Sequence, residues 1–180
     1  MSKLFYVMGA SGAGKDTLMN YARNAVQSTE KIVFAHRYIT RSPFSGNENH
    51  ISLTEQEFKT RLKQGLFSLH WGSHNNLYGI GIEIDLWMDK GFNVVINGSR
   101  EYLPTAQKIY PNIIPILIAV SPDVLEERLL LRGRESQEEI SKRIQRTQDL
   151  NVTIENCQQI QNDSSVEDAG GKLLEIISAA

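Results

Sequence analysis

The stretch that most constrains the fold of this chain reads GASGAGKDT and runs from Gly9 to Thr17. It follows an apolar run at residues 4–8 and precedes a segment whose composition suits a helix. A glycine-rich turn between a strand and a helix can aim several backbone N–H groups at one phosphate, while the positive helix end and a lysine add charge. The sequence therefore predicts a P-loop that binds ATP through Gly9, Ala10, Ser11, Gly12, Ala13, Gly14, Lys15, Asp16 and Thr17.

One position departs from the usual P-loop pattern. The residue after the lysine is commonly a Ser or Thr whose hydroxyl contacts Mg²⁺, whereas here it is Asp16, with Thr17 one residue later. Either Asp16 contacts the metal through water or Thr17 supplies the hydroxyl, and both remain open. The predicted strand 92–96 ends in Asn97, where many P-loop proteins have a carboxylate that holds Mg²⁺ through water, so Asp16 could substitute for it.

Size and composition limit the class of protein. A chain of 180 residues with 41% hydrophobic content supports one core, so we expect a single domain over residues 1–180. The net charge of −2 gives no bulk attraction for nucleic acid or an anionic membrane, so small molecules are the expected partners, with the oligomeric state open. The single cysteine, Cys157, excludes an internal disulfide framework. Without a leader or a membrane-length apolar run, the expected location is cytoplasmic.

The segments alternate between short β-branched runs and helical patterns, which is typical of an α/β fold with a parallel sheet and helices on both faces. Strands are predicted at residues 4–8, 31–35, 92–96, 113–120 and 158–161. Helix starts are predicted at Thr54, Ser121, Ser136 and Ser165, whose side chains can accept from free backbone N–H groups. The polar stretch 36–49, together with the segment that runs to Tyr78, predicts a substrate-binding excursion from the sheet.

Arginines near the C-terminal third indicate phosphoryl transfer. Arg128 and Arg132 lie four residues apart, Arg134 follows, and Arg143 and Arg146 fall on the next predicted helix. Guanidinium groups spread positive charge around a migrating phosphoryl group, and a helix–loop–helix that carries them can close over ATP as a lid and exclude water. The alternative is a solvated helical face on which neighbouring glutamates balance the arginines.

Several motifs in this order resemble the guanylate kinase family. The P-loop is similar to that family's G-P-S-G-x-G-K, Thr40-Arg41 to its T-R motif, and Trp71 with the N-x-Y-G at 76–79 to its W and N-x-Y-G signature. The stretch 128–133 is similar to its R-L-x-x-R-G motif. The resemblance implies a guanylate kinase-like P-loop NTPase fold with an acceptor-binding region at 36–87 and a lid at 128–146. It also implies catalytic roles for Lys15, Arg128, Arg132 and Arg143, and an ATP-binding role for Asn162.

The chain departs from guanylate kinases where that family binds its acceptor. The second arginine of T-R-x-x-R is Phe44, and the D-Y-x-F segment aligns with ENHI at 48–51. The acidic residue before the tryptophan is His70, and the D-x-D after strand 92–96 is NGS at 97–99. A site built to hydrogen-bond guanine loses discrimination when its acceptors are replaced, so GMP is not the expected acceptor.

A closer resemblance is to the ribose 1,5-bisphosphate phosphokinase family of bacterial phosphonate breakdown, carried by residues 35–41, 46–51, 78–87 and 97–100. It implies ATP-dependent phosphorylation of ribose 1,5-bisphosphate to 5-phospho-α-D-ribose 1-diphosphate. No general base is needed because the nucleophile is already an ionised phosphate oxygen. Cations and hydroxyl partners suited to this acceptor are Arg37, Arg41, Glu48, Asn49, His50, His70, Tyr78, Ser99 and Arg100.

Two alternatives remain at this stage. One is a guanylate kinase or another small-molecule kinase on the same fold. The replacement of the acidic residues that contact guanine in that family disfavours a guanylate kinase. The other is a guanylate kinase-like binding module without catalysis, which would have no need of Gly14, Lys15 or the lid arginines.

Overall fold

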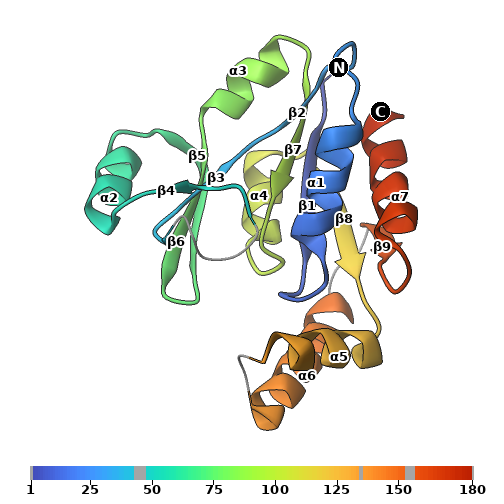
Figure 1. The fold of residues 1–180 in the computed structure, drawn as a ribbon. Helices are drawn as coiled ribbons and strands as arrows, with labels where there is room; N and C mark the ends of the chain where they lie inside the picture. Colours follow the sequence, from blue (N-terminus) through green and yellow to red (C-terminus); the bar gives the residue numbers. More distant parts are fainter. Residues whose placement is uncertain (1, 43–47, 134–135, 153–156, 180) are drawn as a thin grey trace.

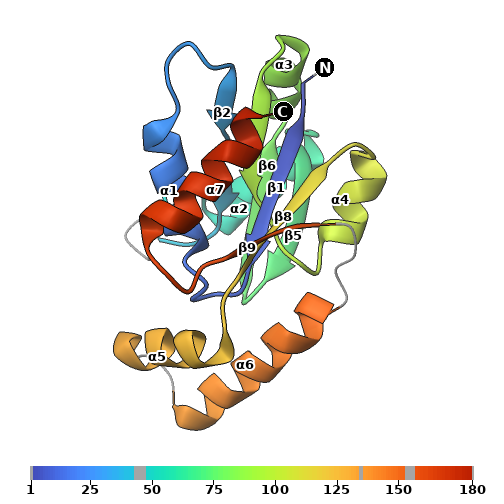
Figure 2. The ribbon, with the colours of Figure 1, turned by 90° about the vertical axis from the view of Figure 1, so that its right-hand side faces the viewer.

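The structure, a computed structural model, describes residues 2–42, 48–133, 136–152 and 157–179, and the side chains of 151 and 152 are outside the description. A five-stranded sheet with helices on both faces forms the body of the molecule, and a second sheet projects from it (Figure 1). The two helices α5 (Pro122–Arg132) and α6 (Gln137–Val152) lie together below the body (Figures 1 and 2). Among the described helices, none has the length and apolarity that a bilayer crossing requires.

The five-stranded sheet is parallel throughout and contains all five strands that the sequence predicts. Its order is β2 (Ile32–Phe34), β7 (Asn93–Asn97), β1 (Leu4–Gly9), β8 (Ile114–Ala119) and β9 (Gln158–Gln161). The central strand β1 is buried along nearly its whole length because both of its faces are covered. The P-loop therefore starts from a strand that is enclosed on both faces.

Alternate residues of β1 feed two hydrophobic cores. Phe5 and Val7 pack toward α1 (Lys15–Ala25) and α7 (Val166–Ser178), which cover one face of the sheet. Leu4, Tyr6 and Met8 belong to the core on the other face, together with residues of α3 (Glu83–Asp89), α4 (Leu103–Ile109) and the second sheet. This division follows from the two-residue period of side chains along a strand.

The excursion predicted from residue 36 onward is itself a four-stranded sheet, which the sequence did not predict. Its order is β4 (Ile51–Ser52), β3 (Arg37–Ile39), β6 (Asn76–Gly81) and β5 (Phe67–Ser73). The helix α2 (Glu55–Lys63) packs on it through Phe58, whose ring stacks on Phe67 at a centroid distance of 4.6 Å. β3 continues directly from the end of β2 in the main sheet, so the excursion is anchored beside the P-loop sheet.

Three of the four predicted helix starts have the expected cap. Thr54 Oγ1 and Ser165 Oγ accept from backbone N–H groups three residues later, both at 3.1 Å, and Ser136 forms a capping box with Glu139. Ser121 differs, because its side chain makes no capping bond and its backbone N–H instead donates to Asp163 Oδ1 at 2.8 Å. The predicted roles of Phe44 and Arg134 concern positions outside the described residues.

Candidate active site

The P-loop connects β1 to α1 and contacts Asn162 in the C-terminal part of the chain. Gly14 adopts a left-handed backbone conformation with φ of 84°, and a Cβ there would lie 2.4 Å from Asn162 Nδ2. Asn162 is buried and donates from that nitrogen to the Ala13 carbonyl at 2.6 Å. Only glycine fits this position, because both the backbone angle and the neighbouring amide exclude a side chain.

A cavity of about 860 Å³ opens over the P-loop, at the carboxyl ends of the central strands, where α/β sheets usually bind ligands. The main sheet, the excursion and the two helices α5 and α6 all contribute to its walls. Its charged lining is eight basic side chains against three acidic ones, which favours phosphate-rich ligands. The basic residues are Lys15, Arg37, Arg41, Arg100, Arg132, Lys142, Arg143 and Arg146, and the acidic ones are Asp16, Glu48 and Glu101.

Lys15 and Asp16 form a charged pair on the P-loop side of the cavity. Lys15 Nζ donates to Asp16 Oδ1 at 3.3 Å, and Asn97 Nδ2 at the end of β7 donates to the same oxygen at 2.9 Å. Burial raises the pKa of the Asp16 carboxyl, but Lys15, Arg37 and these hydrogen bonds outweigh burial and leave the pKa below its ordinary value. Asp16 is therefore an anion at neutral pH, fixed from two sides.

The oxygens of Asp16 and Thr17 fit a role in holding Mg²⁺. Both residues line the cavity, and carboxylate and hydroxyl oxygens are hard ligands that Mg²⁺ accepts. Among the described residues, no group of three His, Cys, Asp or Glu could form a metal cage. A site with one carboxylate and the phosphates of a nucleotide is the usual arrangement for this ion.

The excursion contributes a compact cluster of two arginines around one carboxylate. Arg37 donates to both oxygens of Glu48, at 2.5 Å each, and Arg41 donates to Glu48 Oε2 at 3.2 Å. The Cζ atom of Arg37 also lies over the Tyr78 ring, 5.1 Å from its centroid. The Tyr78 ring stacks on the Trp71 ring with a centroid distance of 5.6 Å. Burial and stacking fix the orientation of Arg37, so its position in the cavity is built into the excursion.

Three residues predicted to bind the acceptor do not line the cavity. Asn49 is exposed, and its side-chain amide lies 3.1 Å from His36 Nε2. His50 lies next to Arg41, and its Nδ1 is 3.4 Å from NH2 of the guanidinium. His70 is exposed on the opposite face of β5 from the buried Trp71, because adjacent strand residues point to opposite sides.

Asn162, predicted to bind ATP, and Arg128, predicted to be catalytic, both have other contacts. Asn162 is bound to the P-loop backbone as described above and does not line the cavity. Arg128 approaches the Ala13 carbonyl with NH1 at 3.5 Å, on the α5 side of the loop, and is also absent from the cavity wall. In this structure both residues support the P-loop from outside.

The loop after β7 is shaped by a tyrosine that sequence reasoning missed. Tyr6 is fully buried in β1, and its hydroxyl donates to the Ser99 carbonyl at 2.8 Å and accepts from the Ser99 N–H at 2.9 Å. A Cβ at Gly98 would lie 2.1 Å from the Tyr6 ring, so glycine is required there. The available signal was a polar hydroxyl within an otherwise apolar central strand.

The same loop contacts helix α6 across the cavity. Arg100 NH1 donates to the Thr147 carbonyl at 3.3 Å, and Glu101 pairs with Arg146. Arg132 of α5 and Arg143 of α6 line the cavity on this side.

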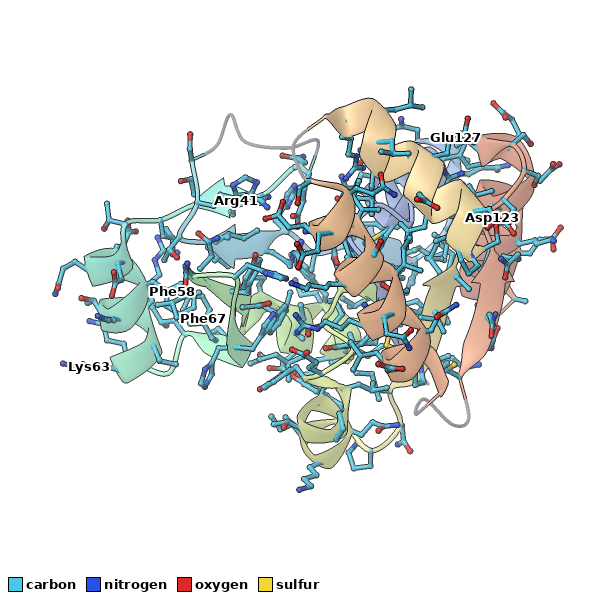
Figure 3. All side chains as sticks on the ribbon, turned by 90° about the horizontal axis from the view of Figure 1, so that it is seen from below. Arg41, Phe58, Lys63, Phe67, Asp123 and Glu127 are labelled. Atoms are coloured by element: carbon cyan, nitrogen blue, oxygen red, sulfur yellow. The ribbon has the colours of Figure 1, made fainter. Side chains whose placement is uncertain are left out.

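Figure 3, which views the molecule from below, shows Arg41 between helix α2, marked by Lys63, and helix α5, marked by Asp123.

Comparison with known proteins agrees with this architecture. A family model described as guanylate kinase matches residues 1–180. The crystal structure of guanylate kinase from Anaplasma phagocytophilum superposes with a TM-score of 0.73 and 16% sequence identity, covering 99% of this chain and 85% of that one. The chain belongs to the guanylate kinase family.

Its more similar relatives carry a more specific name. The ribose 1,5-bisphosphate phosphokinase PhnN of Thiobacillus denitrificans is 52% identical over 178 residues, which cover 99% of this chain and 94% of that protein. The proteins of the same name from Psychromonas ingrahamii and Desulfomicrobium baculatum are 52% and 46% identical, covering 97% and 98% of this chain and 89% and 95% of the relatives.

Proposed function

We propose that this protein transfers the γ-phosphoryl group of ATP to ribose 1,5-bisphosphate, giving 5-phospho-α-D-ribose 1-diphosphate and ADP. The observation that carries the proposal is the similarity over nearly the whole chain to relatives named ribose 1,5-bisphosphate phosphokinase. The charge of the cavity supports it, because both substrates carry several phosphate groups. The whole chain would then act as one kinase domain, with residues 36–87 as the acceptor-binding region and 128–146 as the lid.

On the ATP side, the P-loop provides the phosphate contacts. Its backbone N–H groups and the first turn of α1 would face the β- and γ-phosphates, with the Lys15 ammonium neutralising their charge. Mg²⁺, held by Asp16 or Thr17 together with the phosphates, would supply further neutralisation of the transferred group. Asn162 and Arg128 would keep the loop in its curled conformation through their contacts with Ala13.

On the acceptor side, the cavity offers cations. Arg37, Arg41 and Arg100 line the same cavity as the P-loop and suit the two phosphates of the sugar. The attacking atom is a phosphate oxygen that is already ionised near neutral pH, so the protein need not remove a proton. The task of these side chains is to hold the 1-phosphate in line with the γ-phosphoryl group.

The lid helices would complete the charge around the transferred group. Arg132 and Arg143 project from α5 and α6 into the same cavity, where guanidinium groups can stabilise the charge that spreads over the phosphoryl oxygens. Closing these helices over the cavity would also exclude water that could otherwise accept the phosphoryl group.

The proposal is tested by an ADP-release assay with ATP and Mg²⁺ against ribose 1,5-bisphosphate, GMP, gluconate and no acceptor. Phosphorus NMR of the product should show a new diphosphate at C1 of the sugar, and only with ribose 1,5-bisphosphate. Turnover with GMP instead would assign the chain a guanylate kinase activity. ATP binding without turnover on any acceptor would favour a non-catalytic module.

A further inference from the structure

The Glu48 carboxylate has little capacity left to bind a substrate. Arg37 takes one hydrogen bond to each of its oxygens, Arg41 adds a third, and Asn97 Nδ2 lies 3.5 Å from Oε1. A carboxylate offers about four lone-pair positions in all. The three arginine bonds and the nearby amide occupy these positions, so a sugar hydroxyl would find no free acceptor on Glu48.

The two arginines need a counterion to lie so close together. The Glu48 and Arg37 side chains are only 10% and 11% exposed, so water screens their charges poorly. Without a carboxylate between them, the guanidinium groups of Arg37 and Arg41 would repel each other and turn toward solvent. Glu48 bridges them and leaves both on the wall of the cavity.

Arg41 still has hydrogen-bonding capacity that none of the described residues uses. Its Nε is buried and has no hydrogen-bond partner among the described residues. Buried guanidinium donors without a partner are costly, and a bound anion with several oxygens would supply the missing acceptor. The Arg41 side chain lines the cavity that also contains the P-loop, so the expected ligand of its guanidinium is a phosphate group.

We propose that Glu48 is a positioning residue: it holds Arg37 and Arg41 together as a receptor for a phosphate group of the acceptor and does not itself bind the sugar. The identity of the acceptor rests on the proposed function, whereas the phosphate receptor rests on the geometry of these three side chains. Glu48→Gln keeps the shape of the side chain but replaces one oxygen by a donor. That donor would face the N–H groups of Arg37, so the arginine pair would separate.

The test compares Glu48→Gln with Glu55→Gln, a matched control on the exposed start of α2 that pairs with Lys59. Calorimetry measures the Kd of inorganic phosphate with ADP present to occupy the P-loop, and steady-state kinetics give the KM values of ribose 1,5-bisphosphate and ATP. In Glu48→Gln we expect the phosphate Kd and the acceptor KM both to rise about tenfold, with the KM of ATP unchanged. Glu55→Gln should match the wild type.

Other outcomes overturn the proposal in distinguishable ways. Tighter phosphate binding by Glu48→Gln would mean that Glu48 occupies the phosphate position and is displaced by the acceptor. A higher acceptor KM with unchanged phosphate binding would mean that Glu48 contacts the sugar. Glu48→Asp keeps the charge and should recover part of the phosphate binding, so it tests the idea if the Gln variant does not fold. A wild-type protein without turnover on the sugar would reject the proposed function but leave the phosphate titration decisive for Glu48.

Discussion

Asn97 joins the end of β7 to the first turn of α1 by donating from Nδ2 to Asp16 Oδ1 at 2.9 Å. The same nitrogen lies 3.5 Å from Glu48 Oε1, so one neutral amide separates two carboxylates that approach from different elements. A third carboxylate at position 97 would be repelled by both of them. The structure thus gives a physical reason for asparagine at a strand end where many P-loop proteins have a metal-binding carboxylate.

Asn97→Asp should destabilise the protein and impair turnover. The change replaces a buried donor by a carboxylate beside Asp16 and Glu48, and we expect a loss of about 1–3 kcal/mol in the free energy of unfolding. Urea denaturation at pH 7.5 measures it. Combining the change with Asp16→Asn restores one donor and one acceptor across the contact, so the double variant should recover part of the loss. Strictly additive losses in the double variant would show that the two side chains are not coupled.

Lys15→Ala should reduce turnover by at least about 100-fold, because the proposed function puts this charge at the transferred phosphoryl group. The fold should survive, since the P-loop is also held by Asn162. ADP release and the circular dichroism melting curve measure the two effects separately. Lys63→Ala, at the exposed end of α2, removes the same charge far from the cavity and should behave as the wild type. Wild-type turnover in Lys15→Ala would remove the lysine from the reaction.

Gly98→Ala should disturb both stability and the loop that carries Ser99. The added methyl group would overlap the Tyr6 ring, which is fully buried. Overpacking of this kind costs about 1–3 kcal/mol, and urea denaturation measures it. Tyr6→Leu removes the ring, so adding Gly98→Ala to that variant should cost much less. An equal cost in both backgrounds would point to backbone conformation instead of the tyrosine.

Protonation of His36 should lower stability in mildly acidic solution. Burial and the nearby charge of Arg23 hold the pKa of His36 below its ordinary value. The unfolded chain therefore binds this proton more readily, so the contribution of His36 is complete above about pH 6.5 and is lost as the pH falls toward the lower pKa of the folded protein. His36→Gln cannot titrate and keeps an acceptor for Asn49. Between pH 7.5 and pH 5.5, the free energy of unfolding should fall less in His36→Gln than in the wild type. An equal fall in both proteins would show that His36 does not cause it.

Local patterns carried much of the prediction. The P-loop, the five parallel strands and three of the helix caps depend on residues within a few positions of each other, and each was predicted from the sequence. His70 was predicted at the acceptor but does not line the cavity, and the alternation of Leu69, His70 and Trp71 along one strand contains the signal that separates His70 from its buried neighbours. Ser121 begins a helix as predicted, but its side chain makes no capping bond, and its backbone N–H donates to Asp163.

The sequence by itself determined the class of fold, the glycine-rich loop between β1 and α1 and the residue types available to the site, because these follow from local backbone preferences and the spacing of apolar residues. Only the tertiary structure decided which of those residues meet. The contacts of Asn97 with Asp16, Glu48 with Arg37, and Asn162 with Ala13 join positions 81, 11 and 149 residues apart. Hydrogen bonds need atoms within about 3 Å, and only the order of the strands, the course of the excursion and the packing of the loops bring these atoms to that distance.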